Sequence, residues 1–260
     1  MAFMHRVLLP AAGLLLGLGF WAEASAANRV VACGGDSNWP PMSYATPDDA
    51  QVKGFSADVL RTIFSSDTDL LIQLRPWVRC LTEVTRNDGA DIVMSFLRNP
   101  EREKQFVFSR SYASLSPAYI YLANRYPAPP VRVLADLARL KVCALRGAST
   151  SYTKLPVDAI DAGSSGYPSL VGKLNRGHCD VVVDMQEVLL GHKKLGIIPL
   201  VAGQHTIALL PETEPHPLHF GISKDNPQAA KLVDRLDRGI QNLQRSGMLA
   251  KMLASYQLGK

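Results

Sequence analysis

The chain has 260 residues with 28 basic and 23 acidic side chains, which gives a formal net charge of +5 at pH 7. Its basic residues are scattered along the sequence instead of clustered, which argues against nucleic acid as a partner and favours a small anionic ligand. The length allows one large domain or two compact ones, with enough chain to bury a core.

The first 26 residues have the pattern of a cleaved secretory signal. His5 and Arg6 precede an apolar run from Val7 to Phe20, and the small residues 24–26 supply a signal-peptidase site. Cys33 lies too far beyond this run to serve as a lipoprotein anchor. No later stretch of the sequence reaches the roughly 20 apolar residues that a membrane helix needs. We therefore expect a mature chain that begins after residue 26 and works in the periplasm.

Strand-like and helix-like segments alternate after the signal, in the order that produces sheets of parallel strands covered by helices. The predicted strands are 30–33, 70–74, 91–95, 142–145 and 181–183, and the predicted helices are 56–64, 81–87, 134–140, 170–175 and a C-terminal pair, 232–243 and 248–256. The first helix of that pair carries an apolar stripe at spacings of four, four and three residues. Two similar units in tandem, separated by the proline-rich stretch 126–130, indicate an α/β protein with two lobes.

The four cysteines of the chain stand far apart in the sequence. They are Cys33, Cys80, Cys143 and Cys179, and none of their spacings matches a zinc site. In an oxidising compartment they allow three different pairings into two disulfides. The alternative is that each is a small buried hydrophobic residue. We expect neither a metal nor a cofactor.

Seven short motifs occur in one order along the mature chain. They are Asp36–Pro41, Gly54–Val59, Gly89–Ser95, Pro100–Arg102 with Phe108–Tyr112, Asp136–Leu137 with Lys141–Val142 and Arg146–Thr150, Leu174–Asp180, and Phe220–Lys224. In this order the motifs resemble the family 3 periplasmic solute-binding proteins, which carry polar amino acids and related small molecules to ABC transporters. Each motif alone is weak, but the resemblance covers nearly all of the mature chain.

The resemblance implies the two-lobe, type II periplasmic-binding-protein-like α/β fold, with two hinge strands near 113–118 and 217–222. Lobe 1 would then comprise residues 27–117 and 217–260, and lobe 2 would comprise residues 118–216. Closure of the lobes on a small-molecule ligand would report occupancy to an ABC transporter permease in the inner membrane, and the protein would act as a monomer. Because a bridge between lobes would hinder closure, the expected disulfides are Cys33–Cys80 and Cys143–Cys179.

Three of the residues implied to bind the ligand lie in lobe 1. Arg102 takes the place of the family arginine that clamps a ligand carboxylate bidentately, and its alternative role is a solvated arginine in the charged run 101–104. Trp39 and Trp77, both expected on loops, take the places of aromatic residues that sandwich the ligand. The alternative for Trp77 is ordinary core packing.

Three further residues are implied by the same motifs. Asp36 corresponds to an acidic residue at the family cleft, although it would equally well cap a turn. Ser149 and Thr150 match a polar pair at the start of a lobe-2 helix, where free N–H groups favour an anion. Their structural alternative is a plain N-cap, and both roles are compatible.

The sequence departs from the family pattern in lobe 1. Leu97 stands where the family usually has a small hydroxyl residue five positions before the clamp arginine. We expect Ser95 and Arg98 to fill this gap.

A second departure lies in lobe 2. Counting from Asp180 places Met185 where the family has the aspartate that binds the ligand ammonium, and Asp184 comes one position early. A regular strand would then point Asp184 to the other face, whereas a bulge would turn it into the cleft. Several arginines are expected near the cleft: Arg79, Arg98, Arg102 and Arg146. An organic acid without an ammonium therefore competes with an amino acid as the ligand.

An enzyme is the competing class, because the fold that the resemblance implies also hosts a few periplasmic dehydratases. Its acid or base would be Glu187, Asp184 or a histidine. The histidines show no metal-binding spacing, and the chain has no nucleophile elbow and no phosphate loop. We therefore expect a binding protein and not an enzyme. A third possibility is a stand-alone ligand-sensing subunit.

Overall fold

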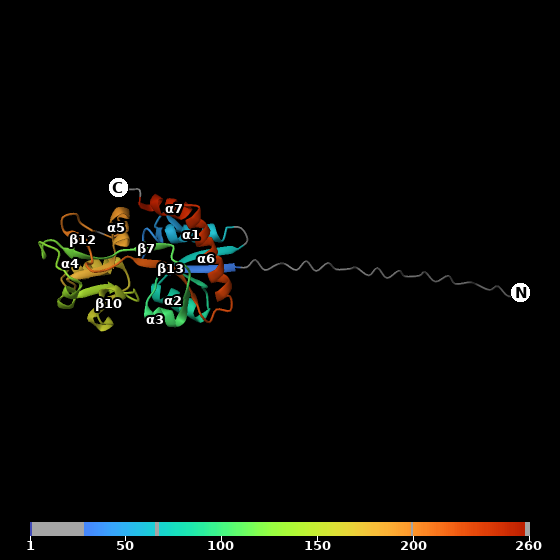
Figure 1. Ribbon diagram of the computed structural model, residues 1–260, viewed down its shortest axis with the longest axis horizontal. Coiled ribbons are helices and arrows are strands. Elements are labelled where there is room, and N and C mark those ends of the chain that lie inside the picture. The colour runs from blue at the N-terminus through green and yellow to red at the C-terminus, as the bar shows by residue number, and fades with distance from the viewer. Residues whose placement is uncertain (2–28, 66–67, 199, 258–260) are drawn as a thin grey trace.

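The computed structural model describes residues 29–65, 68–198 and 200–257, together with Met1. The predicted signal segment, residues 1–26, lies outside these ranges apart from Met1. Within them, no helix is both long enough and apolar enough to span a membrane. Figure 1 shows two α/β bodies side by side, each built on one sheet.

The first sheet has the strand order β4-β1-β5-β13-β6, and β7 also pairs with β13. Its strands are β1 (Arg29–Gly35), β4 (Asp69–Arg75), β5 (Ile92–Leu97), β6 (Phe106–Phe108), β7 (Ala113–Leu115) and β13 (His216–Ser223). β1 is parallel to β4 and β5, whereas β13 is antiparallel to β5. The accompanying elements are the hairpin β2 (Tyr44–Thr46) and β3 (Asp49–Lys53), and helices α1 (Phe55–Ile63), α2 (Trp77–Arg86), α3 (Pro100–Gln105), α6 (Ala229–Arg245) and α7 (Met248–Gln257).

The second sheet has the strand order β10-β9-β11-β8-β12. Its strands are β8 (Pro117–Leu122), β9 (Val142–Leu145), β10 (Ile160–Ser164), β11 (Val181–Met185) and β12 (His205–Leu209), accompanied by α4 (Tyr167–Asn175), α5 (Gln186–Leu195) and the 3₁₀ turns η1 (Leu134–Arg139), η2 (Ser151–Thr153) and η3 (Val157–Ala159). Every residue of β8 and β11 is buried. Such fully buried strands belong at the centre of a sheet that is covered on both faces.

The chain crosses between the two sheets twice, at neighbouring places. β7 ends at Leu115 in the first sheet, and β8 begins at Pro117 in the second. On the return, β13 begins at His216, which pairs with Leu115. Ser116 is held at the first crossing by Glu187 of α5, which accepts its backbone N–H at 2.9 Å and its hydroxyl at 3.1 Å. This arrangement suits a two-strand hinge, and the lobe limits at 117 and 216 stay predictions.

Most of the predicted strands and helices are present with shifted ends. α6 buries the predicted stripe Leu232, Leu236, Ile240 and Leu243. The helix predicted at 81–87 begins earlier, at Trp77, and the one predicted at 134–140 is the 3₁₀ turn η1. The hairpin β2–β3 and several short elements, such as β10, β12 and α5, were not predicted. They are short or half-exposed, so their sequences lack a clear apolar period.

The structure has both disulfides that were expected within the lobes. Cys33 of β1 bonds to Cys80 of α2, and Cys143 of β9 bonds to Cys179, just before β11. All four cysteines are fully buried. Each bridge therefore ties a strand to another part of the same body, and neither bridge links the two bodies.

Candidate functional site

A cavity lies between the two sheets, at the carboxyl ends of β1, β5, β9 and β11, which is where α/β sheets bind ligands. Its volume is about 70 Å³. Six of the ten residues predicted to contact a ligand line it: Trp39, Trp77, Ser95, Arg102, Ser149 and Asp184. Arg146 and Met185 line it too.

Arg102 is a buried cation on α3, with only 9 % of its surface exposed. Its Nη1 donates to Leu97 O at 2.6 Å and its Nη2 to Gly147 O at 3.1 Å. The guanidinium also lies 4.4 Å from the ring centre of Phe96. No carboxylate of the described residues forms an ion pair with it. Burial lowers the pKa of Arg102 to about 9, so the side chain still carries its charge near pH 7, next to the carbonyl groups of Leu97 and Gly147 and the ring of Phe96.

The two tryptophans form walls of the cavity and reach across it to the second body. Trp77 is the first residue of α2 and not a loop residue as expected, and its Nε1 donates to Gly147 O at 2.9 Å. Gly147 has φ 73°, and a Cβ there would lie 3.1 Å from Trp77 Cδ1, so only glycine suits this contact. Trp39 Nε1 donates to Asp184 Oδ1 at 3.3 Å.

Asp184 lines the cavity although β11 contains no bulge. The pairing of β11 with β8 keeps one register from Val181 to Met185, yet Asp184 and Met185 both contact the cavity at the strand end. The expectation that a regular strand would turn Asp184 away is therefore wrong. Its Oδ1 also accepts the N–H of Met185 at 2.7 Å, and its Oδ2 accepts the hydroxyl of Tyr167.

Buried hydroxyl groups form the polar floor of the cavity on the side of the first sheet. Ser95 Oγ lies 3.1 Å from Ser43 Oγ and 2.9 Å from Ser56 Oγ, and Ser56 Oγ lies 2.7 Å from the hydroxyl of Tyr112. Ser95 has φ 58°, a conformation that is strained for residues other than glycine and is often found at functional sites. Ser43 and Ser95 line the cavity, so the network offers neutral polar groups to a ligand.

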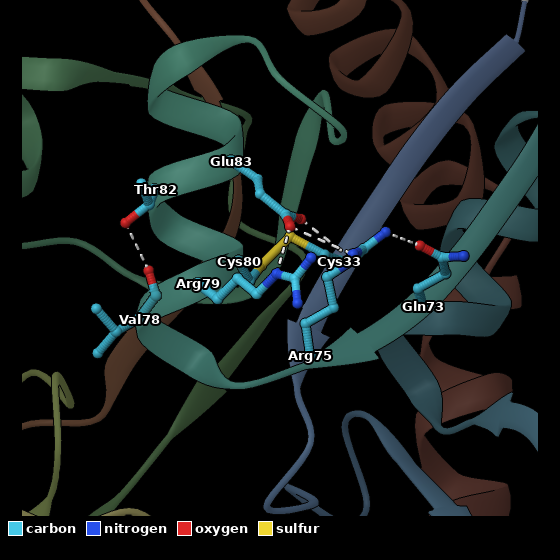
Figure 2. Close-up of polar contacts among 8 residues, drawn as sticks. All are labelled: Cys33, Gln73, Arg75, Val78, Arg79, Cys80, Thr82 and Glu83. Atoms are coloured by element: carbon cyan, nitrogen blue, oxygen red, sulfur yellow. Dashed lines mark hydrogen bonds and ion pairs between the residues drawn. A yellow bond between two sulfur atoms is a disulfide. The ribbon is translucent and has the colours of Figure 1, made fainter.

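The other four predicted ligand residues do not line the cavity. Arg79 Nε donates to Glu83 Oε1 at 2.7 Å, beside the Cys33–Cys80 bridge, as Figure 2 shows. Arg98 similarly donates to Glu103 at 2.6 Å. Both arginines are exposed, and each forms an ion pair with a glutamate a few residues away.

Asp36 and Thr150 also lie outside the lining. Asp36 is exposed, and its backbone N–H donates to Arg75 O at 2.8 Å. Thr150 accepts the hydroxyl of Thr153 on its carbonyl oxygen at 2.7 Å. The helix expected to begin at Ser149 and Thr150 is only the three-residue 3₁₀ turn η2. Ser149 nevertheless lines the cavity, and its Oγ accepts Asn99 Nδ2 at 3.1 Å.

Some lining residues were missed by the sequence analysis. Tyr152, which is 6 % exposed, lines the cavity. Its pKa is raised, mainly by burial and to a smaller extent by the negative charge of Asp184. Ser43 and Met94 also line the cavity. No local pattern marks them, because their roles depend on segments that meet only in the folded chain.

Two buried groups near the cavity respond to pH in opposite directions. Burial raises the pKa of Asp184 from 3.8 to about 6, so its contribution to stability is present below pH 4 and is lost as the pH rises through 6. Burial lowers the pKa of His192, on α5, from 6.5 to about 4, opposed by the backbone of Asn38. Its contribution is present above pH 6.5 and is lost as the pH falls through 4. Tyr167 lies between them, 4.0 Å from the ring centre of His192.

Among the residues that the structure describes, no three or more His, Cys, Asp or Glu side chains are grouped to hold an ion. The charged residues that line the cavity are Arg102, Arg146 and Asp184. The arrangement is suited to enclosing a small anionic ligand.

Residues 31–259 match the model of the family described as bacterial extracellular solute-binding proteins, family 3. Among curated proteins, none matches this sequence.

Solved structures share the fold at low sequence identity. The amino acid ABC transporter substrate-binding protein AbpA from Streptococcus pneumoniae, bound to L-arginine, has 21 % identity and a TM-score of 0.72 over 88 % of this chain and 94 % of its own. The arginine-, lysine-, histidine-binding protein ArtJ from Geobacillus stearothermophilus has 17 % identity and a TM-score of 0.71 over 89 % and 96 %. The ancestral amino acid-binding protein AncCDT-1, a precursor of cyclohexadienyl dehydratase, has 17 % identity and a TM-score of 0.69 over 88 % and 95 %. These likenesses confirm the expected type II binding-protein fold.

Proposed function

The chain belongs to the bacterial extracellular solute-binding proteins of family 3, and from this premise we propose that its cavity closes on a small ligand that carries a carboxylate. Arg102 is the observation that carries the proposal. It is buried, lines the cavity and has no ion pair with any described residue. A buried charge is costly unless it is paired, so an anionic ligand is the partner that this site lacks.

The geometry around Arg102 favours a planar anion. Its recorded hydrogen bonds use two of the five N–H groups of the guanidinium, and the remaining donors suit a carboxylate bound through both oxygens. The family role of the site and the ligands of the solved relatives, L-arginine for AbpA, support an amino acid or a related organic acid. The apolar and aromatic lining would enclose the rest of the ligand.

The wider role follows from family membership. We place the mature protein in the periplasm as a monomer that delivers its ligand to an ABC transporter permease in the inner membrane. The two adjacent chain crossings support lobes that open and close about Ser116 and the start of β13.

A substitution of Arg102 tests the carboxylate site. In Arg102→Ala we expect ligand-induced thermal stabilisation to disappear, because an unpaired buried carboxylate costs roughly 3–5 kcal/mol, which exceeds a hundredfold in affinity. Arg102→Lys should restore only part of the binding, since an ammonium lacks the planar fork. Arg98→Ala is the matched control, because Arg98 is exposed and paired with Glu103. Full affinity of Arg102→Ala in a calorimetric titration would refute the assignment.

An enzyme on the same fold remains the second candidate, favoured by one observation. Asp184 lines the cavity, and burial raises its pKa to about 6, which suits a general acid. Glu187, the other acid considered, is bound to Ser116 instead. Mass spectrometry of a metabolite panel incubated with the protein would separate the classes, since a binding protein returns every compound unchanged.

A further inference from the structure

We infer that the ligand of this cavity is a carboxylate without an ammonium group, and that Asp184 instead positions Trp39 as a wall of the closed cavity. The inference rests on the proposed function and narrows its ligand class. The protein itself supplies hydrogen-bond donors to Asp184.

The carboxylate of Asp184 is already occupied by protein donors. Oδ1 accepts the indole N–H of Trp39 at 3.3 Å and the backbone N–H of Met185 at 2.7 Å, and Oδ2 accepts the hydroxyl of Tyr167. A carboxylate has about four acceptor positions, so these donors leave roughly one. An ammonium brings three donors to a group that is only 7 % exposed, and more than one of them could bind Asp184 only by displacing Trp39, Tyr167 or the N–H of Met185.

The charge balance of the cavity points the same way. Arg102 and Arg146 line it on the positive side, and Asp184 is its one charged acid among the described lining residues. Burial of Asp184 disfavours its anionic form. A net positive cavity favours a net negative ligand over a zwitterion, and the hydroxyl groups of Ser43 and Ser95 are neutral.

Trp39 links Asp184 to the closure of the cavity. The two residues are 145 positions apart in the sequence and belong to the two different bodies. Their hydrogen bond therefore exists only when the bodies approach each other. The part of the ligand beyond its carboxylate would lie among side chains that line the cavity and favour an apolar group. These are Trp39, Trp77, Met94, Leu145 and Met185.

Matched ligand pairs test the inference. Calorimetric titration of the mature chain would compare acetate with glycine, 4-methylpentanoate with L-leucine, 3-phenylpropanoate with L-phenylalanine, and glutarate with L-glutamate. We expect the member without an ammonium to bind at least about tenfold more tightly in every pair that binds, because the amino acid desolvates an ammonium without gaining a charged partner. Asp184→Asn should not selectively weaken the amino acids.

A second readout follows the closed form, so it is recorded with the tightest-binding carboxylate of these pairs bound. The mature chain contains two tryptophans, Trp39 and Trp77, so NMR resolves two indole N–H signals, assigned with Trp39→Phe. Asp184→Asn should shift the Trp39 signal and speed its hydrogen exchange, while the signal of Trp77, which donates to Gly147 O, stays in place. Asp36→Asn, which changes an exposed acid, is the control and should move neither signal.

Different outcomes would contradict the ligand class inferred here and the carboxylate site at Arg102. Tighter binding of the amino acids that is lost in Asp184→Asn, or an unchanged Trp39 signal in that variant, overturns the inference and leaves the carboxylate site standing. Binding by no member of any pair, or by carboxylates equally well in Arg102→Ala, overturns the proposed function and the inference with it.

Discussion

Gly191 on α5 tests whether the two bodies must approach as closely as they do here. It faces the backbone of Pro40, the residue after Trp39, in the other body. A Cβ at Gly191 would lie 2.5 Å from Pro40 O and 2.7 Å from Pro40 C. Because both are backbone atoms, no side-chain rotation relieves the clash. The substitution Gly191→Ala should therefore hold this part of the cavity open.

The expected loss of ligand affinity in Gly191→Ala follows from distances in the structure. An ordinary contact of a Cβ begins at 3.4 Å, so the Pro40 segment has to move back by about 1 Å. The hydrogen bond from Trp39 to Asp184 is already 3.3 Å long and would not survive that movement. A hydrogen bond to a charged group contributes about 1.5–3 kcal/mol, so ligand affinity should fall roughly tenfold to hundredfold. In the helix itself, the same change should stabilise α5 by about 0.5–1 kcal/mol.

The assay combines chemical denaturation with calorimetric titration, using the tightest-binding member of the ligand pairs above. Gly172→Ala in α4 is the matched control, since its Cβ would meet the flexible guanidinium of Arg176 at 3.2 Å. We expect both variants to be at least as stable as the wild type, and only Gly191→Ala to bind weakly. Wild-type affinity in Gly191→Ala would refute the reasoning, because the ligand-bound state would then not need this contact.

Two further predictions concern stability. Between pH 4 and 6 the opposite responses of Asp184 and His192 should nearly cancel in the wild type. Denaturation at several pH values should show that the free energy of unfolding rises with pH by up to about 3 kcal/mol in Asp184→Asn and falls by a similar amount in His192→Gln. Parallel curves for all three proteins would contradict the pKa shifts. The double substitution Cys143→Ser with Cys179→Ser opens a bridge across 36 residues and should lower the free energy of unfolding by about 4 kcal/mol; an unchanged denaturation midpoint would show that the bridge does not restrict the unfolded chain.

Local patterns in the sequence were sufficient for the fold class and for part of the site. The apolar stripe of α6 and the buried run of β11 follow from the periods of helix and strand. Motif order placed Arg102, Trp39 and Trp77 at positions that line the cavity. Such features depend on residues close together in the chain, so they can be read without knowing which segments meet.

The tertiary structure decided which charged groups belong to the cavity. Arg79 and Arg98 resembled ligand residues in the sequence, yet each pairs with a nearby glutamate at the surface. Conversely, Tyr152 carries no local signal and lines the cavity.

The sequence by itself determined two α/β units, their cysteine content and the position of Arg102 within its motif. Only the tertiary structure decided that Asp184 faces the cavity and is bound by Trp39, 145 residues away, and that Gly191 lies against Pro40. The physical reason is that the partners of a side chain depend on how distant segments pack. Burial among those partners, and not residue type alone, sets the pKa of an acid and the donors that it accepts.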